Sequence, residues 1–309
     1  MLKSLLCVGA VLLAVLPLEA NARAADSIGI TVGSLGNPYY VALVKGATAE
    51  AHALNPVVRV IAVSADYDLN KQFNQIDNLI AAGVKMILVT AIDQNAVLPA
   101  IKRAQAAGII VVGVDVNANG ADAVVQTDNM AAGTLSCRYL AKKIGEKGNV
   151  IIENGEQVSA VVDRVNGCKA ELAKYPGIRL LDSSQNGKGS RDGGLDVTQG
   201  YLVRYPTIAG IFAVNDPQGI GTGLAIKQAR RTGIVVTSVD GAPDIVSALK
   251  SDTPEQGSAS QDPFTMGKLA VQVGTQIMNG KRPAQKTTLM APRLITRDNV
   301  ADYVGWTQH

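Results

Sequence analysis

The sequence is poor in aromatic residues and in histidine, and neither sign of charge prevails. Aromatic residues make up 4% of the 309 positions, with one tryptophan, and there are two histidines. The cores must therefore be aliphatic, and aromatic side chains that stand together are candidates for a special role. The net charge of +3 argues against a nucleic-acid partner bound through its phosphates.

Motifs for catalysis and for metal binding are also missing. The sequence contains no P-loop, no zinc-ligand spacing and no nucleophile elbow. The glycines of Gly219–Gly223 lack the G-x-G-x-x-G spacing of a dinucleotide loop. Asp66–Asn70 with Asp77 imitates a calcium loop, but Lys71 stands where that loop needs glycine, and a helix start explains the cluster. We expect no catalytic residue, no metal and no cofactor.

Long apolar runs are confined to the N-terminus. Lys3 precedes the apolar block Leu5–Leu18, and small residues follow it, which is the pattern of a secretory signal. We place the cleavage after Ala24, with Ala22 as the alternative, so residues 1–24 form the signal peptide. Cleavage removes two positive residues and one negative residue and leaves a net charge of +2. We expect a soluble protein exported to the periplasm.

Two cysteines remain after that cleavage, Cys137 and Cys168. Export places them where a disulfide can persist, and both fall in predicted helices that flank one strand. The alternative is that they are two small buried side chains.

Apolar runs alternate with helical segments in two successive sets. The eight strand-like runs begin near Ile28, Val57, Val84, Ile109, Val150, Ile178, Ile208 and Ile234. Within each set the spacing of 25 to 30 residues leaves room for one helix per gap, the rhythm of βαβ units. The sequence therefore predicts an α/β fold with two parallel sheets, each covered by helices on both faces.

Three further extended stretches lie outside these sets, at Ala123–Asn129, Ser258–Pro263 and Thr287–Thr296. We interpret the first as a crossing between two domains. The second is followed by a helix, Phe264–Met278, and carries the chain back to the first domain. The predicted lobes are residues 25–126 plus 262–290 and residues 127–261 plus 291–309.

A turn with two adjacent tyrosines follows the first predicted strand. Asn37 is a good N-cap, and Pro38 suits the first helical position because its missing N–H costs nothing there. Tyr39 and Tyr40 would stand beyond the carboxyl end of a parallel strand, where open α/β sheets bind ligands. The alternative is that Asn37 only caps the helix and the tyrosines only pack.

Polar residues recur just after the predicted strands, namely Asn37, Asp115, Thr127, Arg164, Asn215, Asp240 and Gln261. A single residue of this kind is usually only a helix cap. Carboxylates accept hydrogen bonds, guanidinium groups donate in a fixed fork and amides do both. The recurrence therefore suits a ligand made of hydroxyl groups, and tyrosine faces would cover its C–H surface.

These residues lie in segments that together resemble a known family. From about Ser27 to Asn299 the chain is similar to the periplasmic sugar-binding proteins of the ribose-binding type, which deliver sugars to ABC importers. The segments that carry the resemblance are Asn37–Tyr40, Gly113–Asp115, Thr127–Asn129, Asp163–Gly167, Phe212–Asp216, Ser238–Gly241 and Ser260–Gln261.

The resemblance implies a periplasmic binding protein type I fold, with two doubly wound, flavodoxin-like domains joined by three crossover strands. It also implies a small sugar or polyol as the ligand and the membrane permease of an ABC importer as the partner, and we expect a monomer. The positions that contact sugar in that family match Asn37, Tyr39, Tyr40, Asp115, Thr127, Arg164, Asn215, Asp240 and Gln261 here.

Two positions depart from the pattern of ribose binders. Val116 stands where those proteins often have arginine, and Gln185–Ser190 offers no aromatic residue to close the pocket from the second domain. We therefore expect a pocket shaped for a different ligand, such as a branched or furanose sugar or a short polyol.

Three rival functions follow from the same residues. A transcription regulator with this fold would need an N-terminal helix-turn-helix, where the export signal stands. A sugar-processing enzyme would use paired carboxylates such as Asp115 and Asp240. A receptor for a non-sugar signal molecule would feed a sensor instead of a transporter.

Overall fold

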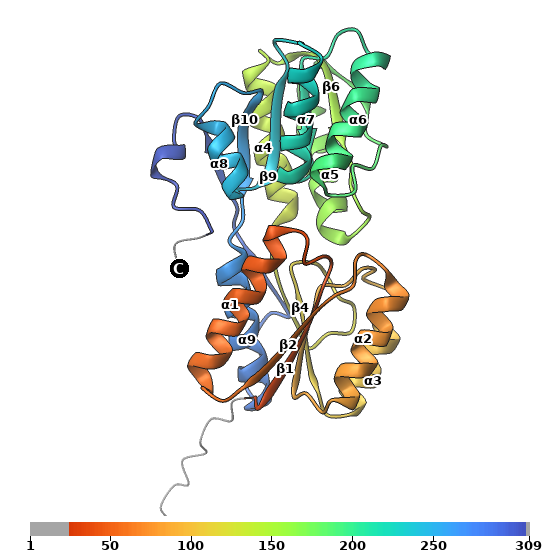
Figure 1. Ribbon diagram of the computed structural model, residues 1–309, viewed down its shortest axis with the longest axis vertical. Helices are drawn as coiled ribbons and strands as arrows, with labels where there is room; N and C mark the ends of the chain where they lie inside the picture. Colours follow the sequence, from red (N-terminus) through yellow and green to blue (C-terminus); the bar gives the residue numbers. More distant parts are fainter. Residues whose placement is uncertain (1–24, 307–309) are drawn as a thin grey trace, which may run out of the picture.

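Two α/β domains follow one another along the long axis of the protein (Figure 1). The computed structural model describes residues 25–306, so the predicted signal peptide and its cleavage site lie outside the described residues. Within the described range, no helix combines the length and the apolar character that a membrane span requires.

The N-terminal domain contains a six-stranded sheet in the order β11-β5-β4-β3-β1-β2, with all neighbours parallel. Helices α1 and α9 cover one face, and α2 and α3 cover the other (Figure 1). Strand β3 is buried over its whole length, in keeping with its unbroken apolar sequence. The elements are β1 (Ser27–Val32), α1 (Pro38–Leu54), β2 (Arg59–Ser64), α2 (Leu69–Ala81), β3 (Met86–Val89), α3 (Leu98–Ala106), β4 (Ile110–Val114), β5 (Ala123–Thr127), α9 (Pro263–Met278) and β11 (Thr287–Met290).

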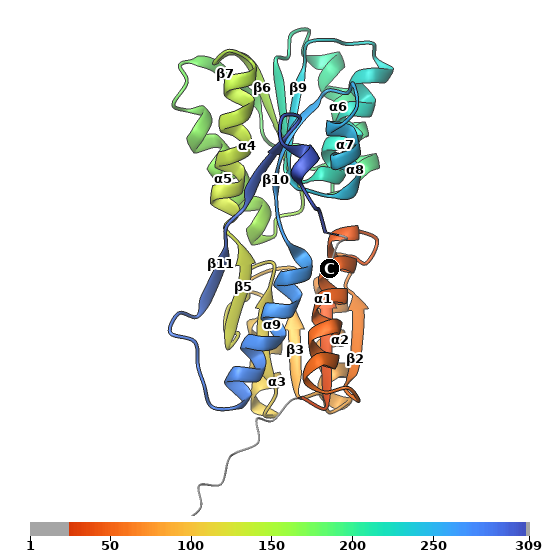
Figure 2. The same cartoon turned by 90° about the vertical axis from the view of Figure 1, so that its left-hand side faces the viewer.

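The C-terminal domain contains a second six-stranded sheet, in the order β12-β10-β9-β8-β6-β7. Its neighbours are parallel except β12, which runs antiparallel to β10. Helices α4 and α5 lie on one side of this sheet, and α6, α7 and α8 lie on the other (Figure 2). The elements are α4 (Asn129–Lys143), β6 (Lys147–Glu153), α5 (Ser159–Leu172), β7 (Gly177–Asp182), α6 (Arg191–Arg204), β8 (Gly210–Ala213), α7 (Asp216–Gln228), β9 (Val235–Asp240), α8 (Pro243–Leu249), β10 (Glu255–Ser260), β12 (Arg293–Thr296) and a 3₁₀ turn at Val300–Asp302.

The two sheets have the same topology once the edge strands β11 and β12 are set aside. Each then follows the flavodoxin-like order, in which the second strand lies at one edge and the first lies beside the third. The eight strands of the two predicted sets begin within three residues of their predicted positions. The predicted fold class is therefore confirmed.

The chain crosses between the domains three times, from β5 to α4, from β10 to α9 and from β11 to β12. Figure 2 shows the last crossing, where one extended segment supplies an edge strand to each sheet. The exact lobe boundaries stay a prediction; β5 ends at Thr127, one residue beyond the first of them.

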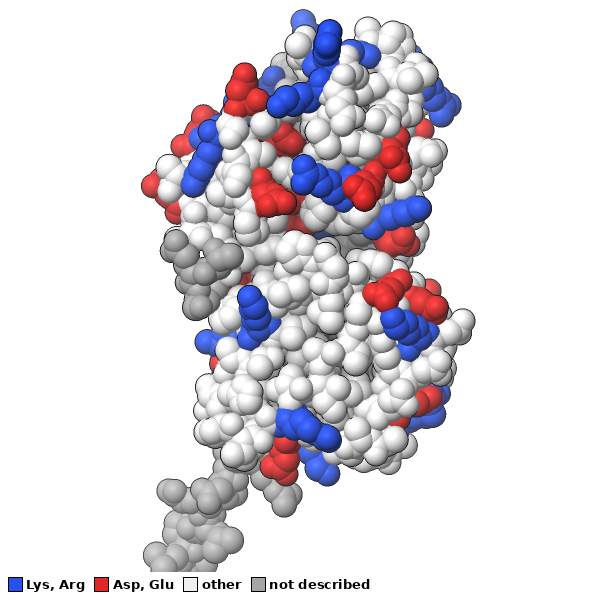
Figure 3. Space-filling view, in the orientation of Figure 1, with Lys and Arg blue, Asp and Glu red and all other residues white. Residues whose placement is uncertain are grey.

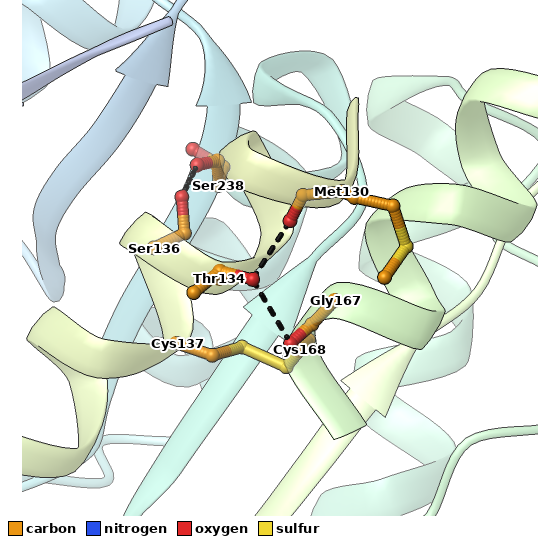
Figure 4. Close-up of a disulfide and its surroundings, with 7 residues drawn as sticks. All are labelled: Met130, Thr134, Ser136, Cys137, Gly167, Cys168 and Ser238. Carbon is orange, nitrogen blue, oxygen red and sulfur yellow. Dashed lines mark hydrogen bonds between the residues drawn. A yellow bond between two sulfur atoms is a disulfide. The ribbon is translucent and has the colours of Figure 1, made fainter. Parts of the chain in front are cut away.

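Helices α4 and α5 are held close together (Figure 4). A disulfide joins Cys137 of α4 to Cys168 of α5, with 5.1 Å between their Cα atoms. Gly133 permits the close approach, because a Cβ atom at that position would collide with the carbonyl oxygen of Arg164 in α5. The two helices thus form one covalently linked layer against the C-terminal sheet.

Candidate functional site

The residues that follow the carboxyl ends of the strands in both sheets meet at the junction of the two domains. A cavity of about 40 Å³ lies there, and a groove of about 440 Å³ adjoins it. Tyr67, Asn37 and Gly189 line both spaces. Eight of the nine predicted ligand residues line the cavity, namely Asn37, Tyr39, Tyr40, Asp115, Arg164, Asn215, Asp240 and Gln261.

The start of α1 directs both tyrosines into the junction. Asn37 is the N-cap and accepts a hydrogen bond from the Tyr39 backbone N–H at 2.9 Å, and Pro38 occupies the first turn. Tyr39 Oη donates to Gln261 Oε1 at 3.3 Å, and Tyr40 Oη donates to Asp115 Oδ2 at 3.2 Å. Asn37 therefore caps the helix and at the same time lines the cavity.

Four residues near the cavity have the left-handed backbone conformation that L-residues rarely adopt. The φ angles are 72° at Asp115, 140° at Asp240, 52° at Asp66 and 57° at Tyr67. Such conformations cost of order 1–3 kcal/mol each and concentrate at functional sites. The strained backbone here belongs to two predicted ligand residues, Asp115 and Asp240, and to the turn that carries a third tyrosine, Tyr67.

Arg164 reaches the junction from inside α5, not from the end of a strand as we predicted. Its Nε donates to Asn129 Oδ1 at 2.8 Å, and its Nη1 donates to the Val214 carbonyl at 3.0 Å and lies 3.5 Å from Asp240 Oδ1. The side chain is buried, so these partners hold the guanidinium fork in one orientation.

Asp115 and Asp240 are buried carboxylates from opposite domains. Burial raises the pKa of Asp115, and Arg164 opposes this effect. Burial also raises the pKa of Asp240 to about 6, again against the attraction of Arg164. Asp240 accepts a hydrogen bond from Gln261 Nε2 at 2.6 Å. The attraction of Arg164 therefore offsets only part of the cost of burying these two carboxylate charges. Hydroxyl donors from a ligand would stabilise the charged forms further.

Asn215 and Thr127 differ from the other predicted ligand residues. Asn215 lines the cavity, but its Oδ1 caps α7 and its Nδ2 donates to the Gly189 carbonyl at 3.0 Å. Thr127 is the last residue of β5 and does not line the cavity. Its Oγ1 is buried and has no hydrogen-bond partner among the described residues.

Part of the lining was not predicted, namely Tyr67, Glu156, Val158, Ala160 and Val161. Gly189 also lines the cavity and belongs to the segment Gln185–Ser190, which we expected at the pocket. Tyr67 is the third aromatic residue of the site, and burial raises its pKa to about 12. The signal for it was the Asp66–Asn70 cluster, which we interpreted only as a helix start. Asp68 does cap α2, accepting from the Lys71 backbone N–H at 3.0 Å, and the same turn brings Tyr67 to the cavity.

The chain also matches known proteins over most of its length. A family model described as the periplasmic binding protein domain matches residues 28–282. The chain belongs to this family. The family comprises substrate-binding proteins of transporters, not enzymes, and it implies a periplasmic location.

Individual members of the periplasmic binding protein family support the predicted ribose-type resemblance, which is confirmed. The ribose import binding protein RbsB of Salmonella typhimurium is 31% identical over 271 residues, covering 87% of this chain and 90% of that protein. The xylitol-binding protein of Mycolicibacterium smegmatis is 30% identical over 300 residues, covering 94% and 84%. A solved ABC transporter solute binding protein from Mycobacterium smegmatis with bound glycerol has a TM-score of 0.85 at 28% identity, covering 91% and 97%.

Proposed function

We propose that this protein is the periplasmic substrate-binding component of an ABC importer and holds a small sugar or polyol between its two domains. The observation that carries the proposal is the set of groups at the junction. Asp115 approaches from the N-terminal domain, Asp240 and Arg164 approach from the C-terminal domain, and tyrosine rings lie beside them.

These groups match the chemistry of a polyhydroxylated ligand. Asp115 and Asp240 accept hydrogen bonds from hydroxyl groups, and Arg164 donates to hydroxyl oxygens. The faces of Tyr39 and Tyr40 cover C–H surface. Relatives named for ribose, xylitol, D-apiose and D-allose indicate the range of ligands to test.

Binding requires the domains to move. The groups that would contact the ligand are buried between the domains, with Asp115, Arg164 and Asp240 at most 5% exposed, so a ligand cannot reach them from solvent while the domains stay together. The three crossings act as a hinge, and we propose that the domains open to admit the ligand and close around it. The closed form is then presented to the membrane permease.

We propose that the protein acts as a monomer and does not bind nucleic acid. Positive and negative side chains are interspersed over both domains on the face shown in Figure 3, and they form no stripe of one sign there. This distribution agrees with the small net charge of the whole chain.

A thermal-shift screen followed by calorimetry tests the proposed function. The mature protein is mixed with D-ribose, xylitol, D-apiose, D-allose and glycerol, and a bound compound raises the melting temperature by mass action. Recovery of the bound compound unchanged separates a receptor from a sugar-processing enzyme. Failure of sugars and polyols to bind, with tight binding of a non-sugar signal molecule, would support the rival receptor function.

Variants of the site test the proposed ligand residues. Arg164→Ala and Asp115→Ala each leave polar groups unmatched in a buried site, which costs roughly 2 to 4 kcal/mol or some 30- to 1000-fold in affinity. Lys169→Ala is the matched control, because Lys169 lies on the same helix as Arg164 but is exposed and outside the cavity. If both site variants bind as tightly as Lys169→Ala, the assigned site is wrong.

A further inference from the structure

The only tryptophan of the chain lies behind the proposed sugar site, although it stands near the C-terminus. Trp306 is 5% exposed and lines neither the cavity nor the groove. The segment after β12 brings it there in two steps. Tyr303 Oη donates to the Gly241 carbonyl at 3.1 Å, and Gly305, with a φ of 73°, reverses the chain.

The indole of Trp306 contacts three proposed ligand residues at once. Its Nε1–H donates to the Asp240 carbonyl at 3.0 Å and to the Gln261 carbonyl at 3.1 Å. These carbonyls stand at the ends of the neighbouring strands β9 and β10. The indole ring also meets Tyr39 edge to face, with 5.5 Å between the ring centroids.

We propose that Trp306 is a positioning residue that holds Asp240, Gln261 and Tyr39 in the geometry that binds the sugar. The inference rests on the proposed function, since it assigns a role in the same site. Asp240 has a left-handed backbone, and its carbonyl accepts from both Trp306 and the Gln261 backbone N–H at 2.8 Å. This pair of donors fixes the peptide unit that aims the Asp240 carboxylate.

The same contacts favour the closed form. Trp306 follows the last strand of the C-terminal sheet, whereas Tyr39 belongs to the N-terminal domain. Tyr39 in turn donates to Gln261, and Gln261 donates to Asp240. Separation of the domains pulls Tyr39 away from the indole ring, so the aromatic contact slows opening and release of the ligand.

Two variants separate the two parts of this role. Trp306→Phe keeps an aromatic ring and loses both hydrogen bonds, and it weakens binding of the tightest of D-ribose, xylitol, D-apiose and D-allose by roughly 5- to 30-fold. Trp306→Ala also loses the ring contact and weakens binding by about a further 3- to 10-fold. Most of the loss lies in faster dissociation. Val304→Ala, an exposed change in the same segment, leaves the affinity unchanged.

Calorimetry distinguishes positioning from a role in folding alone. Positioning raises the dissociation constant while the number of sites stays at one per chain. A lower number of sites at an unchanged dissociation constant, or an affinity equal to that of Val304→Ala, would overturn the inference.

Amide hydrogen exchange tests the positioning role without a ligand. It gives an answer even if the parent protein binds none of the four compounds, a result that would contradict only the proposed function. In the ligand-free protein the Gln261 amide donates to the carbonyl that Trp306 holds. We expect this amide to exchange at least tenfold faster in Trp306→Phe than in Val304→Ala. Equal exchange in the two variants would refute the positioning role.

Discussion

Replacing Glu153 by glutamine should flatten the dependence of stability on pH. Glu153 ends β6 and is 0% exposed. Its Oε2 accepts a hydrogen bond from Thr222 Oγ1 at 2.5 Å, but its Oε1 has no hydrogen-bond partner among the described residues. Burial raises the pKa of this carboxyl from 4.5 to about 8, although the bond from Thr222 opposes the shift.

The sign of the effect follows from which state, the folded protein or the unfolded chain, loses the proton at the lower pH. Between pH 4.5 and about 8 the unfolded chain has lost this proton, while the folded protein still holds it. The stabilisation from Glu153 is therefore complete below pH 4.5, is lost as the pH rises and levels off above about 8. Integrated from pH 5 to pH 8, the loss amounts to about 3 to 4 kcal/mol, since each pKa unit corresponds to ~1.4 kcal/mol.

Urea unfolding followed by circular dichroism at several pH values measures this loss. Other buried carboxylates also titrate, so the informative quantity is the difference between the parent and Glu153→Gln at each pH. The difference between the two free energies of unfolding should change by about 3 to 4 kcal/mol between pH 5 and pH 8, in the direction that favours the glutamine variant at high pH. Asp252→Asn, an exposed change, should give a curve parallel to that of the parent. A parallel curve for Glu153→Gln as well would refute the reasoning.

Three further predictions concern packing and closure. Replacing Cys137 and Cys168 by serine should lower the free energy of unfolding by about 2 to 4 kcal/mol, measured by urea unfolding, and unchanged stability would contradict this. Gly133→Ala should lower the melting temperature because its Cβ would collide with α5, whereas Gly200→Ala, with open space around its Cβ, should stabilise its helix by up to about 1 kcal/mol. Ligand binding should change the emission of Trp306, the only tryptophan, and identical spectra would argue against closure at that residue.

Local sequence patterns predicted the fold because parallel strands and their helices have strong local signatures. Buried strands are rich in apolar residues, as the continuously apolar β3 shows, and Asn37 and Pro38 define the start of α1 by their own chemistry. The same patterns predict polar residues at the ends of strands, and the two sheets bring these ends together. The tyrosine pair and both aspartates at the junction were therefore predictable.

Other parts of the site depend on geometry that no local pattern contains. Thr127 stands at a strand end, but side chains of a strand alternate between faces, and register decides whether one meets the cavity. Arg164 enters from a helix interior, and Tyr67 enters from a turn with left-handed backbone. Trp306 reaches the site only because the chain after β12 folds back. These are tertiary effects. A search of strand ends therefore finds neither Tyr67 nor Trp306, and it assigns Arg164 to the wrong element.

The crossing from β11 to β12 constrains when each domain can complete its folding during synthesis. Strand β11 completes the sheet that β1 begins, and β12 completes the other sheet a few residues later. About 160 residues separate β5 from its edge neighbour β11, a delay of about 8 to 30 s at ordinary rates of synthesis. Neither sheet can be finished until nearly the whole chain exists. Until then the sheets lack their edge strands β11 and β12, and the open sheet edges expose the nascent protein to aggregation.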